Sequence, residues 1–444
     1  MEIEEWGYSI NNKGHLEVDG CDIVAAAKEF GTPLHIVSKK KLIENYRAIR
    51  EAFKDNYPTT EIFYSYKTNC VSGILTILHN ENAGAEVISP YELWLAFKLR
   101  VPPDKIVYNG VDKDSKSLEM AVKKGIRLIN IDSIDEIQKI STIAEKLGVS
   151  ANVGVRVCPK VGWNAQFGLT IESGDAFLAF QRIKNHRNLL PKGIHVHIGT
   201  MVTKYDTYQK AVNDLLHFLL ILKSKLNLTI DYLDLGGGFS IPTVREISGV
   251  EARIFSTLKL PIKQPRKRSC HPIDSFAQNI AEHIKKFCQK HDLPRPCLFL
   301  EPGRYISSNA QILLLSVKAI KEKNPKIAIT DGGRANITFP TSCEYHEIFV
   351  ANRMHSERKC NYFLAGRTCT PSDWIYQCKK LPLLSQGDVI SIMDSGAYFT
   401  SFSNNFAFPR PPIILIDNGT YIILRERETF ENMIINDNVA ESNL

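Results

Sequence analysis

Eight short apolar segments, each followed by a stretch with helical periodicity, constrain the fold of this chain more than any other feature. The segments are rich in β-branched side chains, which is typical of strands buried on both faces of a parallel sheet. Eight strand–helix units within roughly 265 residues is the count and size of a (β/α)8 TIM barrel, so we predict that fold. The expected strands are 62–66, 85–88, 106–108, 128–131, 153–157, 193–198, 232–235 and 298–300.

The pattern changes after the last of these strands. Strand-like runs such as 311–320 and 326–330 then follow one another with turns and little helix, which predicts a second, mostly β domain. The expected parts of the chain are an N-terminal segment 1–32 that packs with the β domain, a barrel 33–305, the β domain 306–435 and a polar tail 436–444.

The composition excludes several classes of protein. Apolar residues make up 44% of the chain and charged residues 23%, which excludes a disordered or fibrous protein. The apolar stretches are shorter than the ~20 residues that span a bilayer, and the acidic N-terminus lacks a signal sequence, so we expect a soluble, cytoplasmic protein without membrane contact. The 10 cysteines form no Cys-x-x-Cys pair, so we expect free thiols and no metal site.

The net charge of +7 is a small excess for 444 residues. Much of it lies in a proline-broken basic run within the insertion 241–272. No aromatic residues alternate with these charges, as binding of single-stranded nucleic acid would require, so a solvated loop is the favoured interpretation and no nucleic-acid partner is expected. The alternative is contact with an acidic substrate arm or with a carrier protein.

Chemistry-bearing residues follow the expected strands at the ends where barrel enzymes place their sites. Lys67 ends the first strand, where partial desolvation would suit a Schiff base, although a lysine at a strand end often only snorkels to water. His195 and His197 share one face of the sixth strand, where an imidazole could stack on a flat ring or be an ordinary core histidine.

The last two strands add groups that suit a phosphorylated ring. Gly236, Gly237 and Gly238 follow the seventh strand and could form a nest of backbone N–H groups for a phosphate, or simply a tight turn. Glu301 and Arg304 follow the eighth strand and could serve a ring nitrogen and a phosphate, or form a surface ion pair. Together, these groups are the parts needed to hold pyridoxal phosphate.

The same residues, in the same order, resemble the fold-type III pyridoxal-phosphate decarboxylases, which include diaminopimelate, ornithine, arginine and lysine decarboxylases. The resemblance covers about residues 31–410. It implies an alanine-racemase-like barrel with a β domain, and a homodimer with shared active sites. It also implies decarboxylation of a small amino-acid-like substrate through an external aldimine and a quinonoid on pyridoxal 5'-phosphate.

The family pattern implies a role for individual residues. Lys67 resembles the Schiff-base lysine, Glu301 the partner of the pyridine nitrogen, and Cys369 the cysteine through which the second subunit returns a proton. Glu92 matches a further glutamate of the family. The implied cofactor-binding residues are Lys67, Glu86, Arg156, His197, Thr200, Gly236, Gly237, Gly238, Glu301, Gly303, Arg304 and Tyr398.

The sequence departs from the family in the residues expected to bind the substrate. Thr370 follows Cys369, whereas diaminopimelate decarboxylases have a glutamate there and ornithine decarboxylases an aspartate, and a hydroxyl cannot neutralise a buried ammonium. Phe339 stands where the diaminopimelate enzymes have an arginine that grips a carboxylate. Glu344 could supply an alternative acid.

A further departure concerns the expected dimer contact. Asp373, which we also expect among the substrate-binding residues, is retained, but its usual lysine partner across the dimer is replaced by Gln166. Either a Gln–Asp hydrogen bond replaces the ion pair or the dimer contact is weaker. From these departures we expect a substrate with an altered distal part, such as an amino acid or conjugate of siderophore or other specialised biosynthesis.

Other functions stay open on the sequence. The chain could be a diaminopimelate, ornithine or lysine decarboxylase proper. It could also be a non-catalytic binding protein, as the antizyme inhibitors are, although those relatives lose cofactor residues that are retained here. An alanine-racemase-like enzyme would pair an arginine with the ring nitrogen, and Glu301 argues against that.

Overall fold

The computed structural model describes residues 2–163, 166–258, 269–337 and 343–438. The chain divides into two compact units that are each built from separate segments. The barrel unit comprises residues 43–241 and 268–306, and the β unit comprises 1–42, 242–267 and 307–444.

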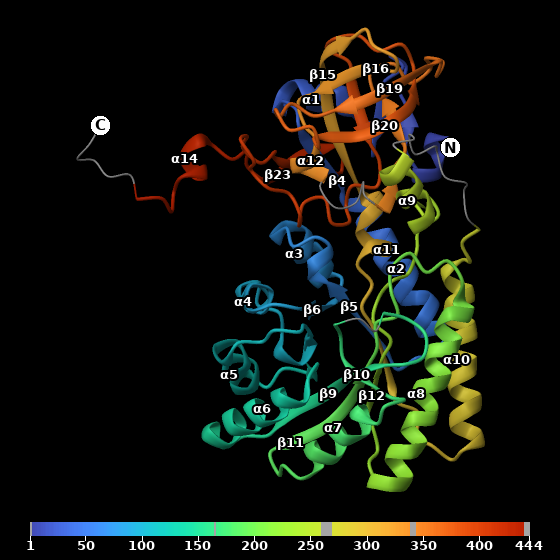
Figure 1. The fold of residues 1–444 in the computed structure, drawn as a ribbon, viewed down its shortest axis with the longest axis vertical. Helices are drawn as coiled ribbons and strands as arrows, with labels where there is room; N and C mark the ends of the chain where they lie inside the picture. The colour runs from blue at the N-terminus through green and yellow to red at the C-terminus, as the bar shows by residue number, and fades with distance from the viewer. Residues whose placement is uncertain (1, 164–165, 259–268, 338–342, 439–444) are drawn as a thin grey trace. The chain divides into compact units, whose positions relative to one another are not determined.

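The barrel unit contains the closed parallel barrel that the strand pattern predicts (Figure 1). The last barrel strand pairs with the first, and the short strand β10 (Leu169–Thr170) adds to the edge of β9 outside the ring. Apart from the first half of β11, the barrel strands are mostly buried, which explains their continuous apolar sequences. The barrel strands are β5 (Thr60–Ser65), β6 (Gly84–Val87), β7 (Ile106–Tyr108), β8 (Leu128–Ile131), β9 (Ala151–Cys158), β11 (Leu189–His195), β12 (Tyr232–Asp234) and β14 (Cys297–Leu300).

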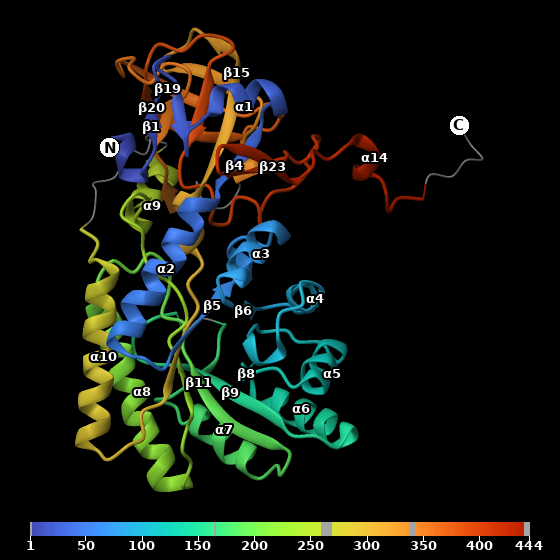
Figure 2. The same ribbon diagram turned by 180° about the vertical axis from the view of Figure 1, so that it is seen from behind.

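Helices lie on the outside of these strands (Figures 1 and 2). Local sequence sets their ends: Asp114 caps α5 by accepting from the backbone of Ser117, and Gly125 ends that helix in a left-handed conformation. The helices of the barrel unit include α3 (Ser72–Asn80), α4 (Pro90–Lys98), α5 (Ser115–Lys124), α6 (Ile134–Leu147), α7 (Asp175–Lys184), α8 (Tyr205–Leu226), α10 (Ile273–Lys290) and the short α11 (Arg304–Ser307).

The β unit is mostly strand, as predicted. Its main sheet runs in the order β20-β19-β16-β15-β4-β22-β23, and β21 pairs with β15 and β18. The strands are β4 (Leu34–Ser38), β15 (Gln311–Lys321), β16 (Lys326–Thr330), β18 (Ile348–Val350), β19 (Cys360–Ala365), β20 (Trp374–Leu381), β21 (Val389–Ile392), β22 (Ile413–Asp417) and β23 (Thr420–Arg425).

The N-terminal part of the chain also belongs to this unit. A small sheet of β1 (Ser9–Ile10), β2 (Leu16–Val18) and β3 (Cys21–Asp22) leads into α1 (Ile23–Phe30). Trp6, Leu16 and Ile23 pack into one apolar cluster with residues of the main sheet, such as Leu314. This packing explains why the first segment groups with the β unit.

The units differ from the expected parts in two places. Residues 33–42 group with the β unit rather than the barrel, because β4 pairs with both β15 and β22. Residues 242–267 of the insertion also group with the β unit, where β13 (Arg245–Glu246) pairs with β17 (Glu344–Tyr345) and α9 (Gly249–Leu258) follows. The basic residues between 259 and 268 lie outside the described residues. Among the helices of the described part, none is long and apolar enough to cross a membrane.

Candidate active site

Lys67 lies just after β5, in a short 3-10 turn formed by Tyr66–Thr68. Its ammonium group donates to the Glu86 carboxylate at 2.7 Å and to the Ser65 hydroxyl at 2.8 Å. Glu86 is fully buried near the end of the neighbouring strand β6, whereas the Lys67 side chain is 31% exposed. The predicted lysine is therefore accessible and is held in place from its buried side.

Asn109 links this pair to Glu301. Asn109 follows β7, and its side-chain amide nitrogen donates to Glu86 at 3.0 Å and to Glu301 at 2.6 Å. Its amide oxygen accepts from Asn130 on β8 at 2.8 Å. Two of the predicted cofactor residues, Glu86 and Glu301, are therefore joined through a residue that sequence reasoning did not select.

These groups belong to a buried polar layer of the barrel. The layer draws side chains from or just after seven of the barrel strands, and all of them are buried. Side-chain polar atoms of His195, Asp234 and Glu301 lie within 4.8 Å of one another, and His195 Nε2 is 3.4 Å from Glu301. The members are Ser65, Glu86, Asn109, Asn130, His195, Asp234 and Glu301.

The electrostatics of this layer favour one ionised carboxylate over its neighbour. Burial opposes the charge on Glu301, but the nearby His195 and Lys67 hold the pKa of Glu301 well below its usual range. Burial raises the pKa of Asp234, and the adjacent Glu301 raises it further. We infer that Glu301 is the charged member and that Asp234 holds a proton, as expected when two carboxyl groups share a buried site.

The three predicted glycines form a cradle that side chains would fill. A Cβ atom on Gly236 would meet the carbonyl oxygen of Val196, one on Gly237 that of Glu301, and one on Gly238 that of Gly199. Gly236 and Gly238 have φ angles of 65° and 99°, which favour glycine. The turn is therefore shaped for close backbone approach, as an anion nest requires.

His197 lies beside this cradle. Loss of water around the ring lowers its pKa to about 3, and the positive charges of Lys67 and Arg156 add to the shift. The backbone N–H of Gly237 donates to Nδ1 at 3.4 Å, which requires an unprotonated nitrogen, and Trp163 packs edge-on at 5.7 Å. His197 is therefore a neutral aromatic ring, suited to stacking.

The other predicted barrel residues have varied surroundings. Arg156 on β9 is 3.9 Å from Asp132 and packs over the Phe167 ring. Thr200 is exposed in the loop after β11. Arg304 is buried at the start of α11, and a Cβ on Gly303 would collide with the Thr68 hydroxyl, so the loops after β14 and β5 pack closely.

Glu92 is the family glutamate that lies on α4. It is buried and accepts from the backbone N–H of Ile88 at 2.8 Å. Burial raises its pKa to about 7, and the nearby Glu86 contributes to the shift.

The remaining predicted residues belong to the β unit. Cys369 is exposed. The Asp373 carboxylate accepts from the backbone of Arg334 and of Thr368, both at 2.8 Å, so it shapes the loop that carries Cys369. Thr370 bonds to Ser372 at 3.0 Å.

Two further β-unit residues have distinctive surroundings. Glu344, considered as an alternative substrate acid, is buried and 3.1 Å from His346, so its carboxylate already has a partner. Tyr398 has a φ of 71°, a strained conformation for a residue with a side chain. Phe339 lies outside the described residues.

Sequence reasoning missed Ser65, Asn109, Asn130 and Asp234 as site residues, and it left His195 undecided. A signal was present, because each is a polar residue at or just beyond the end of an apolar strand. That position points into the mouth of a barrel, where side chains of successive strands meet.

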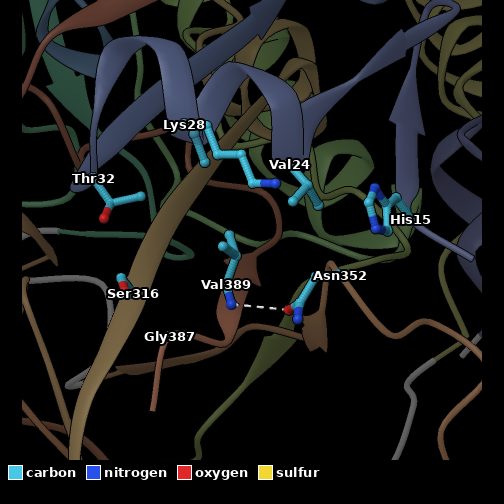
Figure 3. Close-up of a pocket in the computed structure, with 9 residues that line it drawn as sticks. His15, Val24, Lys28, Thr32, Ser316, Asn352, Gly387 and Val389 are labelled. Atoms are coloured by element: carbon cyan, nitrogen blue, oxygen red, sulfur yellow. Dashed lines mark hydrogen bonds between the residues drawn. The ribbon is translucent and has the colours of Figure 1, made fainter. Parts of the chain in front are cut away.

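A cavity of about 350 Å3 lies apart from these residues, within the β unit beside α1 (Figure 3). Its lining includes His15, Lys28 and Asn352, and the amide oxygen of Asn352 accepts from the backbone of Val389 at 2.9 Å (Figure 3). None of the predicted site residues lines this cavity, so it has no part in the chemistry described here.

The barrel residues fit pyridoxal phosphate. The glycine cradle suits a phosphate, the neutral His197 ring suits a flat pyridine, and the ionised Glu301 suits a protonated ring nitrogen. Lys67 is the accessible amine that a carbonyl cofactor requires.

Comparison with known proteins points to the same chemistry. Residues 39–308 match the family described as pyridoxal-dependent decarboxylase, pyridoxal binding domain. The chain is 32% identical over 441 residues to the diaminopimelate decarboxylase of Methanothermobacter thermautotrophicus, and the match covers 97% of each protein. It resembles the crystal structure of diaminopimelate decarboxylase from Methanocaldococcus jannaschii with a TM-score of 0.89 and 30% identity over 100% of both chains. A structure of that enzyme with L-lysine gives a TM-score of 0.88.

Proposed function

The chain belongs to the pyridoxal-dependent decarboxylases, and we propose that its substrate is diaminopimelate. It is a carboxy-lyase that uses pyridoxal phosphate to decarboxylate an amino acid. The substrate proposal is supported by relatives at 30% identity or more that are diaminopimelate decarboxylases along their whole length. These relatives favour the ordinary substrate over the altered one expected from Thr370 and Phe339.

The observation that carries the catalytic proposal is the buried connection from Lys67 through Glu86 and Asn109 to Glu301. When bound, pyridoxal phosphate supplies an electron-withdrawing ring that stabilises the negative charge left as carbon dioxide departs. In our proposal, Lys67 binds the cofactor covalently through its Nζ atom. Glu301 holds a proton at the ring nitrogen, which keeps the ring electron-poor.

Other residues position the cofactor and complete the reaction. The backbone N–H groups of Gly236, Gly237 and Gly238, together with Arg304, bind the phosphate, and the neutral His197 ring packs on the pyridine. The Cys369 Sγ atom returns a proton to the carbon that lost the carboxylate. Cys369 is exposed in a single chain, which is what a residue offered to a partner subunit in a homodimer needs.

A second candidate is a decarboxylase for an amino acid with a different distal group. Thr370 is the observation that favours it, because a threonine hydroxyl stands where diaminopimelate decarboxylases place a charged carboxylate. The hydroxyl bonds to Ser372 at 3.0 Å and carries no charge to neutralise a distal ammonium.

The two candidates are separated by measuring carbon dioxide release at saturating cofactor. The substrates are diaminopimelate, L-lysine, L-ornithine and L-arginine, with Lys67→Ala as the inactive control. Diaminopimelate is expected to react at least about tenfold faster than the others. A protein that binds the cofactor yet releases no carbon dioxide from diaminopimelate would support the altered substrate, and one that binds no cofactor would refute both candidates.

A further inference from the structure

We propose that Asn109 is a positioning residue of the reaction, whose amide holds Glu86 and Glu301 together as one unit behind the cofactor. This inference rests on the proposed function, because it takes the roles of Lys67 and Glu301 from it. Nothing in the family pattern quoted above assigns a role to this position.

The geometry of the bridge is specific. One amide nitrogen carries two protons, and it has two carboxylate acceptors, Glu86 Oε1 at 3.0 Å and Glu301 Oε1 at 2.6 Å. All three side chains are buried, so water cannot replace the bridge. Hydrogen bonds to ionised acceptors in such surroundings are the strong ones, and leaving the acceptor unpaired is costly.

The orientation of the Asn109 amide is set by its neighbour. Asn130 donates its own amide N–H to the Asn109 oxygen at 2.8 Å, so the Asn109 nitrogen must face the carboxylates. Gly154 on β9 makes room for Asn130, because a Cβ atom there would collide with the Asn130 amide oxygen. Residues on or just after three adjacent strands, β7, β8 and β9, therefore fix the direction of the two N–H groups of Asn109.

The bridge meets a physical need of the site. Glu86 and Glu301 both bond to one nitrogen, so two carboxylates lie close together in a buried place, and like charges disfavour each other's ionisation. The other charged groups around them are unevenly placed: Lys67 faces Glu86, whereas His195 and Asp234 face Glu301, and Glu92 adds to the negative charge near Glu86. The uncharged Asn109 amide lets both carboxylates accept a hydrogen bond without adding a further charge.

The test compares substitutions that remove or misdirect this N–H pair. Asn109→Leu removes both donors at similar volume, and Asn109→Asp replaces them with a third carboxylate of the same shape. Asn130→Asp touches neither glutamate, but its carboxylate would attract the Asn109 N–H groups away from them. The matched control is Asn188→Leu. The Asn188 side chain bonds to Ser141 and lies just before β11, outside the polar layer.

Two measurements report on the active site itself rather than on whether the protein is folded. The first is the pH titration of the visible absorbance of the lysine-bound cofactor. When a charged carboxylate loses a hydrogen bond, the acid-side midpoint of this absorbance titration is expected to rise by about one to two pH units. The second is the kinetic split: kcat should fall by roughly tenfold or more while KM stays within about threefold, since the proposal has Asn109 act through Glu86 and Glu301.

The outcomes decide the proposal. The proposal is supported if the titration midpoint rises and kcat falls in all three test variants, which are Asn109→Leu, Asn109→Asp and Asn130→Asp. The control Asn188→Leu should match the wild type in both measurements. If Asn109→Leu fails to fold, the isosteric Asn109→Asp and the remote Asn130→Asp carry the test. Midpoints within about 0.3 pH units of the wild type in the folded variants would overturn the bridge alone. A wild-type protein that binds no cofactor would instead overturn the proposed function.

Discussion

Replacing Glu301 by glutamine tests the assignment of the ring-nitrogen partner, because the change keeps the shape of the side chain and removes its charge. Glu301 is buried, accepts from Asn109 at 2.6 Å and lies 3.4 Å from His195. Burial opposes its charge, yet His195 and Lys67 hold its pKa well below the usual range, which favours the ionised form of the wild-type residue.

The size of the effect follows from the contact that loses its charge. The amide oxygen of glutamine can still accept from Asn109, so the change mainly affects the contact with the protonated ring nitrogen. A hydrogen bond to a charged group contributes about 1.5–3 kcal/mol. Since about 1.4 kcal/mol corresponds to a tenfold change in rate, kcat is expected to fall by roughly 10- to 150-fold.

Stability should fall modestly in the same variant. Burial opposes the charge on Glu301, but His195 and Lys67 hold its pKa well below the usual range, so the ionised carboxylate stabilises the folded state. The neutral glutamine loses that contribution, and the free energy of unfolding at neutral pH is expected to fall by about 1–3 kcal/mol. Measuring cofactor occupancy together with stability separates a catalytic loss from a folding defect.

The assay is carbon dioxide release from diaminopimelate at saturating cofactor. Occupancy is verified by visible absorbance and by borohydride trapping on Lys67, and stability by denaturant unfolding. Asp234→Asn is a useful companion, because it leaves the Glu301 charge in place. A Glu301→Gln enzyme with full cofactor occupancy and kcat within about threefold of the wild type would refute the assignment.

Three further predictions follow from the same structure. Lys67→Ala should abolish covalent trapping of the cofactor by borohydride, read by mass spectrometry, and trapping at another lysine would contradict its role. Cys369→Ala should still release carbon dioxide but misdirect the returning proton, so product analysis should show altered product at a retained rate of release, and unchanged product would refute the proton donor. Glu92→Gln should stabilise the protein at pH 8 by about 1–3 kcal/mol but not below pH 4.5. The reason is that burial raises the folded pKa of Glu92 to about 7, so its favourable contribution is present below the unfolded value and is lost as pH rises to 7. Equal denaturation midpoints at pH 8 would contradict this.

Several features of the fold are readable from local sequence. All eight barrel strands form within a few residues of the expected places, because a strand buried on both faces needs a continuous apolar run. The boundaries between the units were less predictable. β4 is as apolar as a barrel strand, but it pairs with β15 and β22 of the β unit. The composition of a strand does not predict which strands it will pair with.

The sequence by itself pointed to the residues with a recognisable chemical signature: Lys67 at a strand end, the glycine triplet, and Glu301 two residues before Gly303. Only the tertiary structure decided that Asn109 joins Glu86 to Glu301 and that Asn130 orients it. The physical reason is that these bonds join side chains from β6, β7, β8 and the end of β14, so they depend on how closure of the barrel aligns strand ends that are far apart in the chain. The local sequence around an asparagine that follows an apolar strand does not predict which two carboxylates its side chain will bridge.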